Sequence, residues 1–314
     1  MLHLRVISPP ELSDEALKAI DECLGVVNLV VLPGAARSPR GDLIQFDVAR
    51  EAANEVLERL QGLGLHGEGS IAAEQVDLSI SEAAERAQEE APGDGDDAVV
   101  WAQFAQRVDD DSRTTWAFFA FLVIATQLAA IGVIVNSPIL IVGAMVLGPE
   151  FGAIAAICFG LLRADRGLIG RALRTLAVGF AVAIAVTFAC ALVARWVGWI
   201  GTGSLTGHEE IEFIVKPDRW SFIVALLAGA AGVLSVTAGK SSALVGVFIS
   251  VTTVPAAGYF AVAAALTRWE DMAGSVAQLG VNVAGMIISG TLVLLVQRAY
   301  WSRFGMRLPA APKK

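Results

Sequence analysis

The hydrophobic and polar positions of this chain change their pattern near residue 113. Before that point, short apolar segments alternate with polar turns, and after it the apolar runs become long and nearly uninterrupted. Strict alternation predicts half-buried strands, and apolar residues three and four apart predict amphipathic helices. The chain is therefore expected to combine a small soluble domain with a membrane domain.

The N-terminal pattern predicts the order strand, helix, strand, strand, helix, strand. The predicted strands are Leu2 to Ser8, Val26 to Leu32, Leu43 to Val48 and Gly69 to Ile80, and the predicted helices are one that Ser13-Asp14-Glu15 opens and one over Ala52 to Leu63. This order is typical of a ferredoxin-like α+β sandwich, here assigned to residues 1–80.

A segment from Pro33 to Gly41 is predicted to be a loop of this domain. Its residues Gly34, Arg37, Arg40 and Gly41 could hold an anion on backbone amides and guanidinium groups. The alternative is a solvated loop in a domain that serves packing or oligomerisation, because a fold by itself does not license a function.

Residues 81–112 are predicted to form an acidic linker that ends in a juxtamembrane helix. A charged helix is expected over Ser81 to Glu90, and a short amphipathic helix over Val99 to Val108 carries Trp101 and Phe104. This second helix lies either at the membrane surface or against the soluble domain.

Six apolar runs make residues 113–300 the predicted membrane domain, and residues 301–314 form a basic tail. The runs are Thr114 to Val135, Pro138 to Leu162, Ile169 to Val197, Trp220 to Val236, Ala243 to Thr267 and Met272 to Gln297. Each is long enough to cross a hydrocarbon core of about 30 Å at a helical rise of about 1.5 Å per residue.

The positive charges beside these runs predict their orientation. One set of ends carries Arg107, Arg113, Arg163, Arg166, Arg171, Arg174, Lys240, Arg298, Arg303, Arg307, Lys313 and Lys314. The opposite ends carry fewer basic residues alongside several carboxylates. The positive-inside rule therefore places both termini in the cytoplasm.

Composition supports a membrane protein and excludes several other classes. The chain is 55% hydrophobic and 17% charged, with a mean hydropathy of +0.62. The part before residue 113 carries a net charge of about −15 and the rest about +7, so nucleic acid is not an expected partner. Three scattered cysteines and three scattered histidines predict neither a disulfide framework nor a metal site, no cofactor is expected, and the N-terminus lacks the pattern of a cleaved signal peptide.

The second and fifth runs resemble each other and predict an internal repeat. The second has Ser137, then Gly143, then Pro149-Glu150-Phe151-Gly152; the fifth has Ser241-Ser242, then Gly246, then Pro255-Ala256-Ala257-Gly258. Each repeat would hold three spans, so the second would be inverted relative to the first. Inverted repeats with broken helices are typical of transporters, whose sites lie near the midplane.

Glu150 is the charged residue of most interest, because it lies about eleven residues into a predicted span, close to mid-membrane. It is interpreted either as a proton or cation site or gate, or as a neutral residue that hydrogen-bonds a neighbouring helix to fix packing. No basic residue is available at that depth. The residues expected on the transport path are Glu150, Asn136, Ser137, Pro149, Thr252, Thr253, Pro255, Gln278 and Asn282.

Nothing in the spans predicts an enzyme. Gly239-Lys240-Ser241-Ser242 imitates the end of a phosphate-binding loop, but Leu234 stands where the earlier glycine is required. A Ser241 and Lys240 dyad is a remote alternative, and no predicted span contains a histidine.

Three stretches of the chain resemble the bacterial membrane family called domain of unknown function 389. They are N-S-P-I-L-I-V-G-A-M-V-L-G-P-E-F-G from Asn136, T-A-G-K-S-S-A-L-V-G-V-F-I-S-V-T-T-V-P-A-A-G from Thr237, and L-G-V-N-V-A-G near Asn282. The opening L-R-V-I-S-P-P-E is similar to members with an N-terminal soluble domain. The commoner family form often has an apolar residue in place of Glu150 and Arg in place of Lys240. The resemblance implies the architecture and a bacterial inner-membrane address, but no activity.

The sequence thus predicts a six-span α-helical inner-membrane protein of two inverted repeats behind a cytoplasmic ferredoxin-like domain, expected to be a homo-oligomer. Transport or conduction of an ion or small solute is the favoured function. The alternative is a membrane sensor or scaffold that transports nothing.

Overall fold

The computed structural model describes residues 1–76, 78–91, 98–205, 218–239, 246–247, 249 and 251–303. The chain divides into two compact units, one of Met1–Phe104 with the C-terminal segment from Gln297, and one of Ala105–Val296. The division falls inside helix α5 (Trp101–Asp111) and inside helix α14 (Trp269–Ser302).

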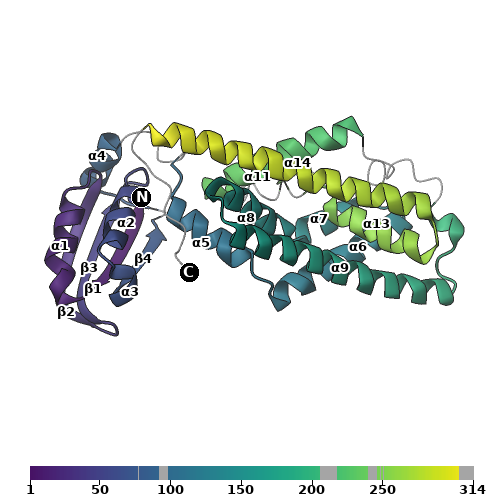
Figure 1. Cartoon of the computed structure of the whole chain (residues 1–314), viewed down its shortest axis with the longest axis horizontal. Helices are drawn as coiled ribbons and strands as arrows, with labels where there is room; N and C mark the ends of the chain where they lie inside the picture. Colours follow the sequence, from purple (N-terminus) through teal and green to yellow (C-terminus); the bar gives the residue numbers. More distant parts are fainter. Residues whose placement is uncertain are drawn as a thin grey trace. The chain divides into compact units, whose positions relative to one another are not determined.

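The first unit is built on a four-stranded antiparallel sheet with the strand order β2-β3-β1-β4 (Figure 1). Its elements are β1 (Leu2–Ser8), α1 (Pro10–Asp21), β2 (Val26–Arg37), β3 (Arg40–Val48), α2 (Ala53–Gly62), α3 (Leu65–Glu68), β4 (Ser70–Gln75) and α4 (Glu82–Glu90). The predicted succession of strands and helices is confirmed, and the sheet order is that of a split βαβ sandwich. β4 ends earlier than predicted.

The core of this unit follows from the alternation along its central strands. Leu4 and Val6 of β1 and Ile44 and Phe46 of β3 are fully buried, and their neighbours in sequence point to the other face. The helices cover the buried face through apolar residues at helical spacing, among them Ile20, Val56 and Leu60.

The start of α5 packs within this first unit, which was one of the two alternatives for the segment. Trp101 is 1% exposed and Phe104 is 3% exposed. The Asn54 side chain of α2 donates to Val99 O at 2.7 Å and accepts from Trp101 N at 2.9 Å. This buried amide fixes the entry into α5, so the Trp101 and Phe104 face is used for packing.

The second unit is helical. Its elements are the end of α5, α6 (Trp116–Ile134), α7 (Pro138–Leu147), α8 (Glu150–Arg163), α9 (Arg166–Trp196), η1 (Thr202–Leu205), α11 (Arg219–Thr237), α13 (Thr253–Ala265) and most of α14. Side-chain oxygens of Thr115, Asp165 and Asp218 cap the first turns of α6, α9 and α11, which explains where these helices begin.

Four of these helices, α6, α9, α11 and α14, are long and apolar enough to span a membrane. A fifth span is formed if α7 and α8, which meet at an angle of 50°, are taken as one broken helix. The predicted span Ala243 to Thr267 is described in its second half, where α13 is a shorter apolar helix. The chain is therefore a membrane protein with four to five apolar spans among its described residues.

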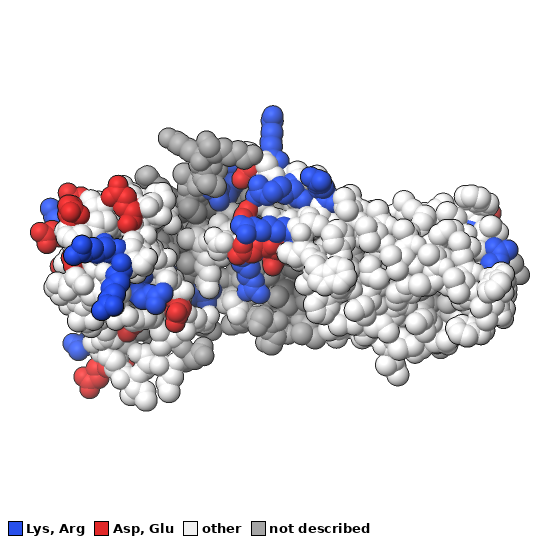
Figure 2. Space-filling view, turned by 90° about the horizontal axis from the view of Figure 1, so that it is seen from below, with Lys and Arg blue, Asp and Glu red and all other residues white. Residues whose placement is uncertain are grey.

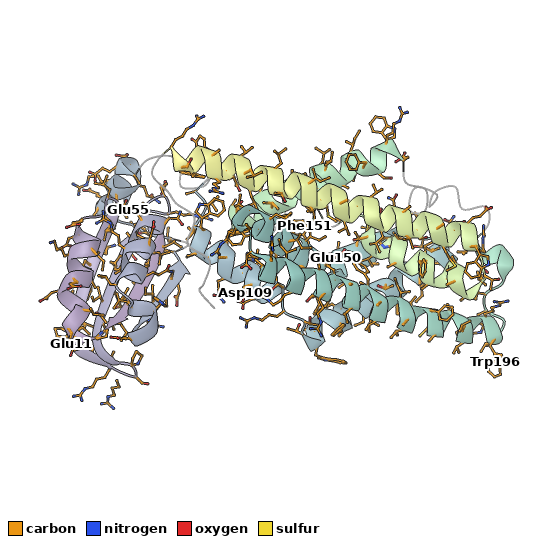
Figure 3. All side chains as sticks on the ribbon, in the orientation of Figure 1. Glu11, Glu55, Asp109, Glu150, Phe151 and Trp196 are labelled. Carbon is orange, nitrogen blue, oxygen red and sulfur yellow. The ribbon has the colours of Figure 1, made fainter. Side chains whose placement is uncertain are left out.

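The surface of the helical unit fits this assignment. Figure 2 shows a broad uncharged zone on this unit between charged ends. Along the described spans, Glu150 lies at the break of the α7 and α8 pair, and the other charged residues lie toward the ends of their spans. Trp196, at the end of α9, is 88% exposed and projects outward (Figure 3), as an aromatic residue at a membrane interface does.

Small residues let these helices approach closely. A Cβ on Gly232 would overlap the ring of Phe151 in α8, and one on Gly229 would overlap Met286 and Ser289 of α14. Helices in lipid associate through such close packing because no hydrophobic effect drives them together.

Candidate functional site

The break between α7 and α8 is created by Gly148 and Pro149. Gly148 ends α7 with an extended backbone, and Pro149 precedes the first residue of α8, Glu150. Proline is tolerated at a helix start because the first amides of a helix have no intrahelical partner. The carboxylate therefore lies at a helix N-terminus, where the helix dipole favours negative charge.

Glu150 meets the N-terminus of α13 inside the helical unit. Thr253, the first residue of α13, donates its hydroxyl to Glu150 Oε1 at 2.5 Å. The Glu150 side chain is 6% exposed and Thr253 is fully buried (Figure 3). Among the described residues no salt bridge involves Glu150, and the side chain that bonds to its carboxylate is a neutral hydroxyl.

A second set of hydrogen bonds joins α13 to α14. Gln278 Nε2 and Asn282 Nδ2 both donate to Thr252 Oγ1, at 3.0 and 2.7 Å. Gln278 is 1% exposed and Asn282 is 3% exposed, and their spacing of four places them on one helix face. Thr252 and Thr253 are adjacent, so α13 links both sets into one group, which we call the polar cluster: Glu150, Thr252, Thr253, Gln278 and Asn282.

Two acceptor atoms of the polar cluster lack a hydrogen-bond partner. They are Glu150 Oε2 and Gln278 Oε1, and each is inaccessible to solvent. An unsatisfied buried acceptor costs about 1–3 kcal/mol, and more for a charged group. Native structures retain such groups rarely, and each one indicates strain, chemistry or an additional ligand.

Pro255 lies beside the polar cluster without breaking a helix. It is the third residue of α13, and the first intrahelical bond runs from Ala256 N to Thr252 O at 3.1 Å. The missing amide of Pro255 therefore falls in the first turn, where no bond is lost. The expected break precedes Pro255 and the helix starts at Thr253.

Asn136 and Ser137 do not belong to the polar cluster. Asn136 has φ = 49° and terminates α6, and the amide of Ser137 donates to Gly132 O at 2.8 Å. The ten residues of α7 then separate them from the break, about 15 Å at helical rise. They form the turn between α6 and α7, and their place on the transport path stays a prediction.

Two of the three helices that carry the polar cluster, α8 and α13, are enclosed by other helices. α8 has Phe151 against Gly232 of α11, and Cys158 Sγ lies 3.6 Å from Ile287 O of α14. α13 packs on α6 and α9, and a Cβ on Gly258 would meet Ala129 and Ala130 of α6. The predicted first repeat contains α6 to α9 and the second α11 to α14. Thus α8 contacts α11 and α14 of the second repeat, and α13 contacts α6 and α9 of the first.

A groove of about 520 Å³ reaches the break from the charged end of the unit. It is lined by Arg107, Asp110, Asp111, Arg113, Thr115, Ala117, Phe118, Phe121, Gly148, Pro149, Phe151, Gly152 and Val236. The Asp111 side chain lies against Gly152, because a Cβ there would come within 2.7 Å of it. Glu150 does not line the groove, although residues on both sides of it do.

Acidic residues at the end of α5 line the groove or bond to arginines beside it. Asp109 accepts from Arg171 of α9 at 2.5 Å and from Arg113 at 3.0 Å. Desolvation raises the pKa of Asp111, with Arg107 opposing the shift and Asp110 adding to it. The sequence analysis did not predict this contact. The signal that could have found it is the acidic run Asp109-Asp110-Asp111 together with the arginines that follow α8.

The proposed anion loop of the first unit is wrong as a loop. β2 continues through Pro33 and Gly34 to Arg37, and Ala36 pairs with Gly41 in a hairpin. The Gly34 amide donates to Asp42 Oδ1 at 2.7 Å, and this bond helps to lower the pKa of Asp42. A carboxylate beside that amide opposes an anion, so Gly34, Arg37, Arg40 and Gly41 are not assembled as the sequence suggested.

No group of three or more His, Cys, Asp or Glu residues that could hold a metal occurs in the described residues. Cys23, Cys158 and Cys190 are all free. Lys240, Ser241 and Ser242, which the repeat and the dyad alternative invoked, lie outside the described residues.

Residues 145–288 match the model of a family described as a domain of unknown function, DUF389. An uncharacterized protein of the archaeon Methanocaldococcus jannaschii is 26% identical over 147 residues, which is 44% of this chain and 41% of that protein. The match thus spans about two fifths of that relative's length. No solved structure matches the chain. The matched region contains all five residues of the polar cluster, and over these residues the chain is similar to the domain of unknown function 389.

Proposed function

We propose that the helical unit transports or conducts an ion or small solute across the membrane, along a path that passes the break between α7 and α8. The observation that carries this proposal is the groove that runs from the charged end of α5 to Gly148 and Pro149, next to the buried carboxylate of Glu150. A carboxylate at membrane depth is expensive and indicates a function in most cases. Glu150 is sealed from the groove, so the path is closed at this point.

The packing of α8 against helices of the second repeat, and of α13 against helices of the first, supports the inverted repeat that this proposal uses. Each of these helices begins at a proline-containing motif, is buried on nearly all sides and contacts the outer helices of the other half. Broken helices that meet at their N-termini form the substrate sites of several transporter folds. If Ala243 to Thr267 forms a complete span, the unit would have six spans. It would then lie in the inner membrane with both termini on the cytoplasmic side.

The first unit is proposed to serve assembly or regulation of a homo-oligomer, and no enzymatic activity is proposed for either unit. A sensor or scaffold that transports nothing is the second candidate. The observation that favours it is the dense burial of α8 and α13, on which ten or more residues each are buried. A fully packed core of this kind can serve assembly alone.

Flux through reconstituted protein decides between these functions. Liposomes with a trapped pH-sensitive dye and an imposed potential would be tested with salts and small organic ions. We expect flux in the native chain, a change in Glu150→Gln and a block in Val236→Trp, which fills the groove. Val178→Trp is the matched control, because Val178 lies on α9 and is 40% exposed. No flux from folded protein, or equal flux in all four proteins, would refute a path through the groove.

A further inference from the structure

We infer that the polar cluster is a binding site for a monovalent alkali cation, held by Glu150 Oε2 and Gln278 Oε1. This inference names the substrate class of the path and so rests on the proposed function. It starts from the hydrogen bonds of the cluster, in which three donors bond to oxygens inside it and two acceptors are left without a partner.

The donors of the cluster point at oxygens inside it. The Thr253 hydroxyl donates to Glu150, and the amide groups of Gln278 and Asn282 donate to Thr252. Two N–H donors occupy the lone pairs of Thr252 Oγ1, so this hydroxyl orients the amides and does not serve as a ligand. The orientation leaves the carbonyl oxygen of Gln278 available.

The two unpaired acceptors define what can bind. Both are oxygens that lack a donor, so an anion would meet two further negative atoms despite the helix N-termini beside it. A cation bound between them would satisfy both oxygens. Carboxylate and amide oxygens are ligands of hard cations, and no histidine or cysteine of the described residues joins them, which argues against a transition metal.

Charge selects a monovalent ion. Glu150 is the one carboxylate of the polar cluster, and an ionised Glu150 with one bound monovalent cation has no net charge. A divalent cation would leave an uncompensated positive charge within the membrane, which is costly. A proton on Oε2 would also remove the charge, and the test below separates the two cases, because protonation at fixed pH does not depend on the alkali cation.

The groove offers a route to this site past Gly148. Gly148 lines the groove, and a Cβ built on it would overlap the Glu150 carboxylate at Oε2. The unpaired oxygen is therefore separated from the groove by a residue without a side chain. Asp110 and Asp111 line the same groove and place negative charge on the approach.

Binding can be tested without any transport, by thermal unfolding of the full chain in detergent at fixed pH and ionic strength. Choline chloride would be replaced stepwise by NaCl, KCl or LiCl. A ligand that binds the folded state raises Tm with its concentration, and a tenfold excess over Kd should raise it by about 3 °C for a chain of this size. We expect a saturable rise with at least one alkali chloride.

Variants identify the ligands. Gln278→Leu should weaken the cation effect at least tenfold, and Glu150→Gln should abolish it. Gln127→Leu is the matched control, since Gln127 lies on α6 away from the cluster and bonds to Cys190. Should Glu150→Gln fail to fold, Gln278→Leu provides the same test. Equal Tm in choline and alkali chlorides, or an effect that survives both substitutions, overturns the inference.

The binding and flux measurements separate the two proposals. A cation-dependent Tm without flux would keep the site and reject transport. Flux that is the same for choline and alkali cations, with no cation-dependent Tm, would keep transport and reject the alkali-cation site.

Discussion

The hydrogen bond between Thr253 and Glu150 can be tested by its contribution to stability. Thr253→Val replaces a hydroxyl with a methyl group of the same shape, so no cavity is created and the effect reports the lost bond. The change removes the donor of Glu150 Oε1, while Oε2 already lacks one. A buried carboxylate would then have no side-chain donor among the described residues.

The size of the effect follows from the membrane setting. Hydrogen bonds to charged groups contribute about 1.5–3 kcal/mol in soluble proteins, whereas interhelical bonds in a membrane average about 0.6 and reach about 1.7 kcal/mol. We expect about 1–2 kcal/mol for Thr253→Val, because its partner is a carboxylate. This corresponds to a Tm decrease of about 2–4 °C in detergent.

Thr126→Val is the matched control. Thr126 is fully buried in α6, but its hydroxyl donates to Leu122 O of the same helix at 2.7 Å, a carbonyl that the helix already satisfies. Its loss should cost less than about 0.5 kcal/mol. In a Glu150→Leu background the cost of Thr253→Val should also nearly vanish, because both partners are then apolar. Equal Tm decreases for the two threonine variants in the native background would refute the reasoning.

Three further predictions address packing, pH and orientation. Gly232→Ala should lower Tm, because its Cβ overlaps the Phe151 ring, and Gly232→Ala with Phe151→Leu should recover part of the loss. Because burial raises the pKa of Asp111 above its ordinary 3.8, stability present at low pH is lost as pH rises through that raised pKa. Asp111→Asn should reduce this loss in thermal unfolding across pH 3–7, and Asp110→Asn, which removes only the smaller Coulombic contribution, should reduce it less. If both termini are cytoplasmic, a cysteine at the exposed Trp196 should react with an impermeant thiol reagent in intact cells, and one at Asp110 only after lysis; the reverse pattern would invert the topology.

The polar cluster could be predicted from sequence because each of its members breaks a local rule. Glu150, Thr252 and Gln278 are polar residues inside apolar runs, and polar groups in lipid must find partners. The spacing of Gln278 and Asn282 gave their common face, and the two proline motifs gave the helix starts. These rules require no knowledge of which helices are neighbours.

The differences between prediction and structure came from distances that local patterns do not contain. Asn136 was grouped with Glu150 because both are polar residues of one run, but the rise of α7 separates them. Pro33 and Gly34 suggested a loop, yet an irregular register between β2 and β3 accommodates both residues in the hairpin. The bond between Asp109 and Arg171 joins residues 62 positions apart, and it depends on how α5 and α9 pack.

The position of Glu150 argues that packing alone does not account for it. A carboxylate at the first turn of α8 gains from the helix dipole and from the Thr253 hydroxyl, so it can be buried without a basic partner. A glutamine would accept the same hydroxyl without the cost of a buried charge. The chain instead keeps an ionisable group whose second oxygen is unpaired and lies against Gly148 at the end of a groove. A cation on the path would bind that oxygen. If Glu150 only fixed the packing of the helices through Oε1, Oε2 would remain buried without a partner.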